Sequence, residues 1–209
     1  MASARFVPNA ESPSPHSAAF STSPLICEAG QFSGAELKIK HIALAGMIGC
    51  VIAPGAQAAS SLARSDISAR LLATHNAERA RMGAAPLRWD PALALAAAAY
   101  GPTLASLGRL RHSPKGNRPG QRENLWMGTR GVFSPEQMVG TWIAERAHFR
   151  PGVYPNVSKT GSWYDVSHYT QLIWKGTTHV GCAIQRSRQW DFLICRYSPP
   201  GNIDGRRVP

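Results

Sequence analysis

The hydrophobic positions of the chain follow a helical period in its central part and alternate as in strands near its C-terminus. After Ser65, apolar Leu71 and Met82 share one helical face with His75 until Gly83 interrupts the pattern, which predicts a first helix. Because His75 lies on this apolar face, we expect it to be a core histidine rather than a metal ligand.

A second helix is predicted from the residues at its two ends. Asp90 is a typical N-cap residue, Pro91 suits the first helical position, and Gly108 follows Leu107 as a helix stop. The segment between them is rich in alanine, which favours helix. The next residues, 109–122, are rich in Arg, Lys, Gly and Pro and are expected to form a loop.

A third helix is predicted from a capping-box pattern over residues 134–137, where Ser is followed by Pro, Glu and Gln. We expect this helix to continue to Phe149. A short strand over residues 124–127 precedes it, and residues 150–166 show no regular period.

The last regular segments predict a β-hairpin. Residues 180–186 and 190–197 are strand-like, and a turn centred on residues 188–189 places Cys182 opposite Cys195. In an oxidising compartment two such cysteines are expected to form a disulfide, and two buried thiols are the alternative. Helices segregated from a small antiparallel sheet indicate an α+β fold.

The N-terminal part is of a different kind. Residues 1–36 are rich in Ser, Pro and Ala without a period, so we expect them to be disordered or untranslated. Residues 37–58 have a basic start, an apolar run over residues 42–53 and an A-x-A site ending at Ala58, which is the order of a signal peptide. The run is shorter than the roughly 20 apolar residues of a membrane-spanning helix.

Export is therefore the expected fate, with a secreted or periplasmic mature chain over residues 59–209 that has no transmembrane span. A lipid anchor at Cys50 is the alternative, because residues 47–50 faintly resemble a lipoprotein signal. Cys27 and Cys50 lie in segments that the mature chain would lack.

Charge adds information about partners. The net charge is +11, and residues 1–58 carry three basic and three acidic side chains, so the whole excess lies in residues 59–209. A chain of 209 residues has room for one ordinary domain and an extra segment. An excess of this size favours polyanions or anionic surfaces as partners.

Five motifs in order closely resemble the CAP superfamily, which contains cysteine-rich secretory proteins, insect venom antigens and plant pathogenesis-related class 1 proteins. They are His75-Asn76-x-x-Arg79, Glu123-Asn124-Leu125-Trp126, residues 168–174 (HYTQLIW), His179-Val180-Gly181-Cys182 and residues 195–202 (CRYSPPGN). The resemblance implies a single CAP (SCP) domain over residues 59–209, folded as a three-layer α-β-α sandwich with a large cleft, in a secreted protein.

The resemblance also implies a cleft with two histidines and two glutamates, which correspond here to His112, Glu123, Glu145 and His168. The sequence independently places Glu145 on the apolar stripe of the third helix, where an unpaired carboxylate is costly. Two imidazoles with supporting carboxylates can hold Zn²⁺ or another divalent cation. The alternative is a hydrogen-bonded cluster that only shapes the cleft.

The sequence has no G-x-S-x-G motif, no H-E-x-x-H motif and no phosphate-binding glycine loop, which leaves three functions open. The first is a binding module for an amphiphilic or anionic ligand, such as a sterol, lipid or envelope component, as the resemblance implies. The second is a metal-dependent hydrolase with Glu123 or Glu145 as the base. The third is a polyanion-binding protein, with nucleic acid ranked last because no nucleic-acid motif is present. A non-catalytic protein is the preferred interpretation.

Six cations near the predicted cleft support an anionic ligand in the first and third hypotheses. They are Arg109, Arg111, Lys115, Arg118, Arg122 and Arg130.

Overall fold

The computed structural model describes residues 4–7 and 55–208, with side chains described for residues 66–208. The predicted signal peptide up to residue 54, the lipoprotein-like Cys50 and most of the N-terminal extension lie outside the described residues. In the part that is described, none of the helices has the length and hydropathy that a bilayer span requires.

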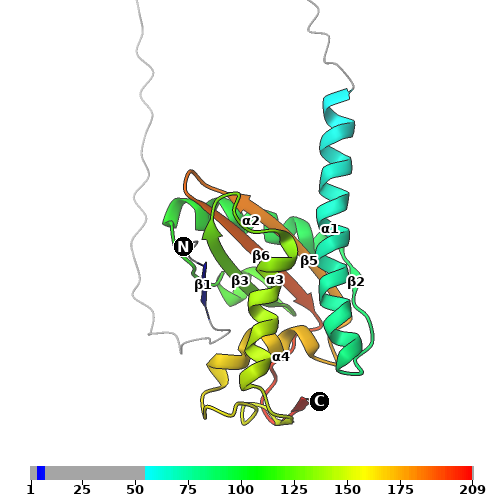
Figure 1. The fold of residues 1–209 in the computed structure, drawn as a ribbon, viewed down its shortest axis with the longest axis vertical. Coiled ribbons are helices and arrows are strands. Elements are labelled where there is room, and N and C mark those ends of the chain that lie inside the picture. Colours follow the sequence, from blue (N-terminus) through cyan, green and yellow to red (C-terminus); the bar gives the residue numbers. More distant parts are fainter. Residues whose placement is uncertain (1–3, 8–54, 209) are drawn as a thin grey trace, which may run out of the picture.

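The described residues form a main sheet, a small second sheet and four α-helices (Figure 1). The helices are α1 (Gly55–Arg81), α2 (Pro91–Leu107), α3 (Pro135–Ala144) and α4 (Ser167–Ile173), with short 3₁₀ turns η1 (Lys115–Asn117), η2 (Glu145–His148) and η3 (Trp163–Val166). The strands are β1 (Ala4–Val7), β2 (Arg88–Trp89), β3 (Arg122–Thr129), β4 (Gly152–Val153), β5 (His179–Arg186), β6 (Trp190–Ser198) and β7 (Arg207–Val208).

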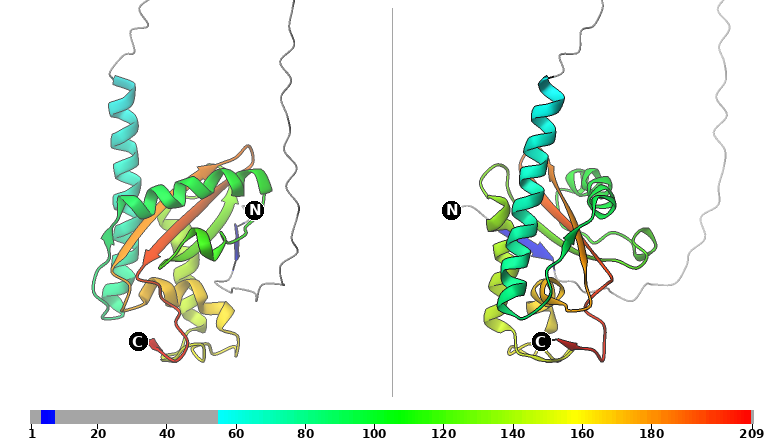
Figure 2. Two further views of the ribbon diagram at one scale, coloured as in Figure 1. Left: turned by 180° about the vertical axis from the view of Figure 1, so that it is seen from behind. Right: turned by 90° about the vertical axis from the view of Figure 1, so that its right-hand side faces the viewer.

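The main sheet has the strand order β1-β3-β6-β5-β2, in which only the β2–β5 pair is parallel. Helix α2 covers one face, and α1, α3 and α4 lie on the other (Figure 2). The second sheet, β4-β7, lies near the C-terminus. These layers confirm the α+β fold and the three-layer sandwich that the sequence resemblance implied.

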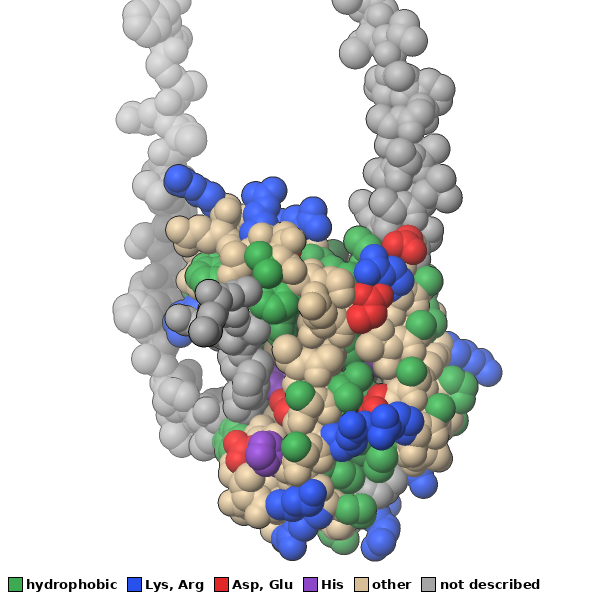
Figure 3. Space-filling view, viewed as in Figure 1, with side chains coloured by type: hydrophobic (Ala, Val, Ile, Leu, Met, Phe, Trp, Pro, Cys, Tyr) green, Lys and Arg blue, Asp and Glu red, His purple; other side chains and the backbone are tan. Residues whose placement is uncertain are grey.

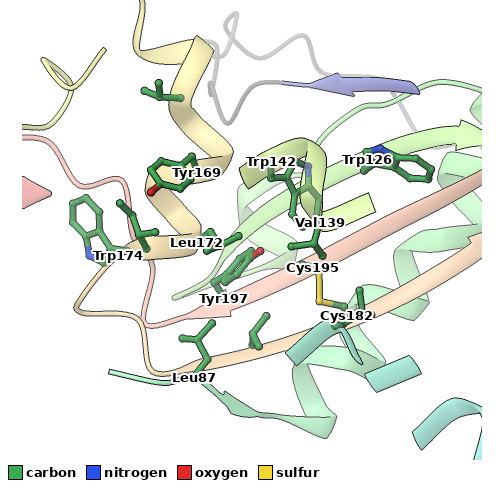
Figure 4. Close-up of a cluster of buried hydrophobic side chains, with 14 of the residues drawn as sticks. Leu87, Trp126, Val139, Trp142, Tyr169, Leu172, Trp174, Cys182, Cys195 and Tyr197 are labelled. Carbon is green, nitrogen blue, oxygen red and sulfur yellow. A yellow bond between two sulfur atoms is a disulfide. The ribbon is translucent and has the colours of Figure 1, made fainter. Parts of the chain in front are cut away.

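Strand alternation divides the core into two clusters, because successive side chains of a strand point to opposite faces. Leu125 and Met127 of β3 pack with α2 on one face. On the other face Trp126 joins Trp142 of α3 and Tyr197 of β6 in the larger cluster (Figure 4). The position of a residue along β3 therefore determines which face of the sheet its side chain occupies.

The predicted ends of the second helix are confirmed. Asp90 Oδ1 accepts hydrogen bonds from the backbone N–H groups of Ala92 and Leu93, and Pro91 occupies the first turn of α2. Gly108 ends the helix with a φ of 61°, a left-handed conformation that glycine adopts without steric cost.

The predicted hairpin and its disulfide are also confirmed. Strands β5 and β6 are antiparallel with Cys182 opposite Cys195, and the two sulfurs are bonded. His75 is a core histidine as expected, fully buried, with Nδ1 donating to Leu71 O at 2.7 Å and Nε2 accepting from the Tyr197 hydroxyl at 2.9 Å. Burial lowers the pKa of His75 to about 4, which keeps the imidazole neutral.

The helices differ from the sequence predictions in three respects. Helix α1 begins at Gly55, ten residues before Ser65, so the predicted cleavage point after Ala58 falls within it. The third helix stays α-helical only to Ala144, and residues 145–148 continue it as a 3₁₀ turn. Helix α4 was not predicted, because all seven of its residues are buried and it has no amphipathic pattern.

Within the extension expected to be irregular, Ala4–Val7 instead forms β1 and pairs antiparallel with Leu125–Gly128 of β3. Without β1, β3 would end the sheet with unpaired N–H and C=O groups, and such an edge accepts extended backbone of almost any sequence. The periodicity of the side chains therefore gave no signal for this strand.

Candidate functional site

The first histidine–glutamate pair joins the loop after α2 to the start of β3. His112 Nδ1 donates to Glu123 Oε1 at 2.8 Å. Ser113 adds two further bonds to the same carboxylate, from its backbone N–H to Oε1 and from its hydroxyl to Oε2, each 3.0 Å. The loop is therefore fixed against β3 through one carboxylate.

Glu123 is fully buried but has a cation beside it. Arg196, its partner across β3 and β6, places Nε 3.0 Å from Oε2 as an ion pair, although the N–H does not point along this contact. Burial opposes ionisation of Glu123, yet the hydrogen bond from His112, the charges of Arg196 and His112, and the Ser113 N–H together hold its pKa below the ordinary value.

The second pair joins the end of α3 to the start of α4. His168 Nδ1 donates to Glu145 Oε1 at 2.6 Å. Glu145 Oε2 accepts from the backbone N–H groups of His168 and Tyr169, both at 3.0 Å. These are N–H groups of the first turn of α4, which have no partner within the helix, so Glu145 caps α4 from outside.

The position of Glu145 in the helix thus differs from the predicted one. It occupies the C-cap position of α3 rather than an interior position of a longer helix, and it is 7% exposed. The sequence reasoning that a buried carboxylate needs partners is confirmed by the three bonds it accepts.

The start of β3 connects the two pairs. Glu123 and Asn124 are consecutive residues of this strand, so their side chains point to opposite faces. Asn124 Nδ2 donates to the backbone carbonyl of His168 at 3.1 Å, which ties the second pair to the strand that carries the first. Among the described residues, no group of three or more His, Cys, Asp and Glu side chains is close enough to hold a metal ion.

The six predicted cations do not form one surface. Arg118 is buried and donates to Ser113 O, so it supports the loop of the first pair. Arg130 donates to Ser187 O at the far end of β3, roughly 25 Å of strand from Arg122. Arg109 and Arg111 are exposed on the segment that leads from α2 to His112.

Lys115 and Arg122 do come together, at a cavity of about 340 Å³. It is lined by Lys115, Arg122, Tyr154, Pro155, Trp163, Asn202 and Asp204. A neighbouring hollow of about 230 Å³ shares Lys115 and Arg122 and adds Arg118, Pro200 and Ile203 among its lining residues. Both open spaces thus lie between η1 and the C-terminal segment.

Arg122 has a fixed position in the cavity wall. Its Nε and Nη2 donate to the backbone carbonyls of Gly201 and Asn202 at 3.0 and 3.1 Å. The Asn202 side chain in turn bonds Thr170 and the carbonyl of Ser167 in α4, at 2.8 Å each. These two backbone carbonyls orient the guanidinium in the cavity wall.

Several residues of the two sites were not identified from the sequence. Ser113 and Arg196 support Glu123, while Tyr154 and Trp163 line the cavity from a stretch that showed no period. Arg196 faces Glu123 only through the register of β3 with β6, which the sequence did not predict. No sequence signal existed for Tyr154 and Trp163, which only the chain path brings near Lys115.

This fold and arrangement define a CAP-type domain, and comparison with known proteins agrees. The model of the cysteine-rich secretory protein family, CAP, matches residues 72–197. The pathogenesis-related protein PR-1 type of Sambucus nigra is 35% identical over 135 residues, which are 64% of this chain and 76% of that protein. The chain therefore belongs to the cysteine-rich secretory protein (CAP) family.

Two solved structures share the fold. Na-ASP-1 is 24% identical with a TM-score of 0.59, over 68% of this chain and 41% of that one. NaASP2 with Zn²⁺ is 23% identical with a TM-score of 0.56, over 66% of this chain and 82% of that one. At these identities the likeness is one of fold.

Proposed function

We propose that this CAP-family protein is a binding module that holds an anionic amphiphile in the cavity beside Lys115 and Arg122. The observation that carries the proposal is the combination, in one cavity, of two cations with the aromatic rings of Tyr154 and Trp163. Cations suit an anionic headgroup, and aromatic walls suit the apolar carbons attached to it.

The size of the cavity limits what it takes. A volume of about 340 Å³ is at the lower end of ordinary ligand pockets. It suits a headgroup with the first carbons of a chain, whereas a whole sterol or diacyl lipid would extend beyond it. Asp204 in the same wall disfavours an anion next to it, so the headgroup is expected on the Lys115 side.

The hydrolase alternative has less support. A general base works best when its pKa is near the operating pH, whereas the pKa of Glu123 is held below its ordinary value. Glu145 already accepts three hydrogen bonds that fix α4. Neither carboxylate is placed as a base in this arrangement.

A divalent ion is a second proposal for the histidine pairs. Both histidines use Nδ1 to donate to a carboxylate, the arrangement usual for metal-bound histidines, so a metal would bind through Nε2 of His112 and His168. NaASP2 was solved with Zn²⁺. Two imidazoles alone make an incomplete zinc shell, so water would supply the other ligands and the affinity is expected to be modest.

We also propose that the protein is exported, because residues 37–58 have the basic start, apolar run and A-x-A site of a signal peptide in that order. Protein recovered outside the cytoplasm with an N-terminus near residue 59 would support it, and intact residues 1–58 on that protein would contradict it.

Calorimetric titration with decyl phosphate tests the ligand class. We expect binding that Lys115→Gln weakens by about tenfold, because one charge-assisted contact contributes roughly 1.5 kcal/mol. Trp163→Ala should weaken it similarly. Arg109→Gln is the matched control, since Arg109 is an exposed cation outside the cavity.

Two results would contradict the proposed ligand class. Equal losses for Lys115→Gln and Arg109→Gln would mean that the protein attracts the anion through its overall charge. Equally tight binding of uncharged decanol would mean that the cations have no part in recognition.

A further inference from the structure

Building on the proposed function, we infer that the end of the molecule carrying the C-terminus docks on an anionic lipid bilayer, from which the cavity draws its ligand. This docking face consists of residues 150–165 and 200–207, at the lower end of Figure 1.

The docking face exposes apolar side chains that a soluble fold usually covers. Among the described residues five large hydrophobic side chains are exposed, and three of them lie here: Val153 (47%), Tyr164 (40%) and Ile203 (42%). The Tyr164 ring stacks on Trp163 with centroids 4.0 Å apart, and Trp163 meets buried Tyr154 edge-on at 5.7 Å. The exposed Tyr164 ring is thus anchored to the core through Trp163.

Segments distant in sequence are held together at this face. Strands β4 and β7 pair Val153 with Arg207, and the backbone N–H of Tyr154 donates to Arg206 O at 2.9 Å. The N–H of Arg206 donates to Ile203 O, which closes the turn that presents Ile203. The apolar and basic side chains are therefore neighbours by backbone pairing.

Cations lie on the same two segments as the exposed apolar side chains. The exposed ones are Arg150, Lys159, Arg206 and Arg207. Residues 150–165 and 200–207 contain two acidic side chains, Asp165 and Asp204, and Asp165 accepts a hydrogen bond from Thr160. Figure 3 shows Lys and Arg side chains interspersed with hydrophobic ones at this lower end.

A bilayer fits this mixture better than a protein partner does. Tryptophan and tyrosine favour the headgroup level of a membrane, and basic side chains near them are attracted by anionic lipids. Protein interfaces, by contrast, concentrate apolar residues at a core that few charges interrupt.

The cavity and its neighbouring hollow lie at the same face. Tyr154 and Trp163 line the cavity, and Ile203 lines the hollow, with Lys115 and Arg122 shared by both. A membrane that contacts Tyr164 and Ile203 would therefore bring lipid headgroups next to these two cations.

Vesicle co-sedimentation of the full chain tests the inference. We expect binding to phosphatidylcholine vesicles with about one-third phosphatidylglycerol, and little binding to phosphatidylcholine alone. Arg206→Glu/Arg207→Glu should weaken binding by at least about tenfold, because it reverses two cations at the surface. Tyr164→Ser/Ile203→Ser should weaken it by several-fold through lost apolar burial.

Matched controls separate the docking face from overall charge and hydrophobicity. Arg109→Glu/Arg188→Glu makes the same charge change at two exposed positions outside the docking face, one just after the C-terminus of α2 and one in the β5–β6 turn. Leu95→Ser removes an apolar side chain that is 71% exposed on α2. Both should bind like the parent. Residues 1–58 are the same in every variant, so their contribution cancels.

The inference would be overturned by equal losses in the control variants, by equal binding to uncharged vesicles, or by sedimentation without vesicles, which would indicate self-association. No vesicle binding at all would also overturn it. If decyl phosphate still bound in a Lys115-dependent way, the proposed function would stand without the membrane. If vesicles bound through the docking face and decyl phosphate did not bind, the docking would stand and the cavity ligand would be rejected.

Discussion

The two histidine–glutamate pairs look alike in sequence, but they are held by different forces. Glu123 faces the buried cation Arg196 and bonds His112 and Ser113. Glu145 has no such cation in contact among the described side chains and is held by His168 and two backbone N–H groups.

This difference gives the pairs different roles. The first pair balances a buried charge and therefore resembles an ion-pair site, in which removing one partner leaves the other costly. The second pair is a helix cap that sets where α4 begins, so its loss leaves unsatisfied but uncharged N–H groups. The same residue types thus respond differently to the same substitution.

The largest expected effect is at Glu123. Glu123→Gln should lower the free energy of unfolding by about 3 kcal/mol, because it leaves the Arg196 guanidinium buried without a counter-charge. Denaturant unfolding measures the loss. The double variant Glu123→Gln/Arg196→Met should lose less than the sum of the two single variants.

Controls sharpen this result. Glu136→Gln removes the exposed ion pair with Arg70 and should have a much smaller effect.

The stability contributed by Glu123 should also depend on pH. Because the fold lowers the pKa of Glu123, this contribution is full above the ordinary carboxyl pKa and is lost as the pH falls through the lower folded value. Acid unfolding should lose this part of its pH dependence in Glu123→Gln. Additive losses at positions 123 and 196 would refute the ion-pair description.

A smaller effect is expected at Glu145. Glu145→Gln keeps one oxygen that can accept from the α4 N–H groups, so we expect a loss of about 1–2 kcal/mol. Hydrogen exchange should show the loss at the amides of His168 and Tyr169, while the amide of Ser113 stays protected. Faster exchange of Ser113 alone would contradict the separation of the two pairs.

The smallest effect concerns a divalent ion shared by the two pairs. If His112 and His168 bind Zn²⁺, a concentration equal to the dissociation constant stabilises the fold by only about 0.4 kcal/mol. Binding should be weaker at pH 5.5 than at pH 7.5, since imidazole ligates when it is deprotonated. Either histidine changed to Ala should abolish binding, whereas His148→Ala, an exposed histidine of η2, should not.

Titration calorimetry on metal-stripped protein decides this. No heat of binding at either pH would leave the two pairs as separate structural clusters.

Much of the fold could be predicted from local signals. Asp90 and Gly108 specify the ends of α2 by backbone chemistry that needs no other part of the chain. The spacing of Cys182 and Cys195 about a turn specifies the hairpin register, because side chains alternate with period two. These predictions were right since each depends on residues close together in sequence.

Long-range packing decided what could not be predicted. Helix α4 is buried on all sides, so its polar residues are satisfied by distant partners such as Asn202 rather than by water. The cavity joins Lys115 to Tyr154 and Trp163 across about 40 to 50 residues of sequence. No periodic pattern in the sequence predicts contacts between residues so far apart.

The sequence by itself determined the family, the α+β layers, the disulfide and the four residues of the two histidine–glutamate pairs. Tertiary structure alone decided that Arg196 neutralises Glu123 while backbone N–H groups hold Glu145, and that two of the six cations share a cavity. The physical reason is that residue type and short-range spacing fix local hydrogen bonding and strand register, whereas charge pairing and burial depend on which distant segments fold against each other.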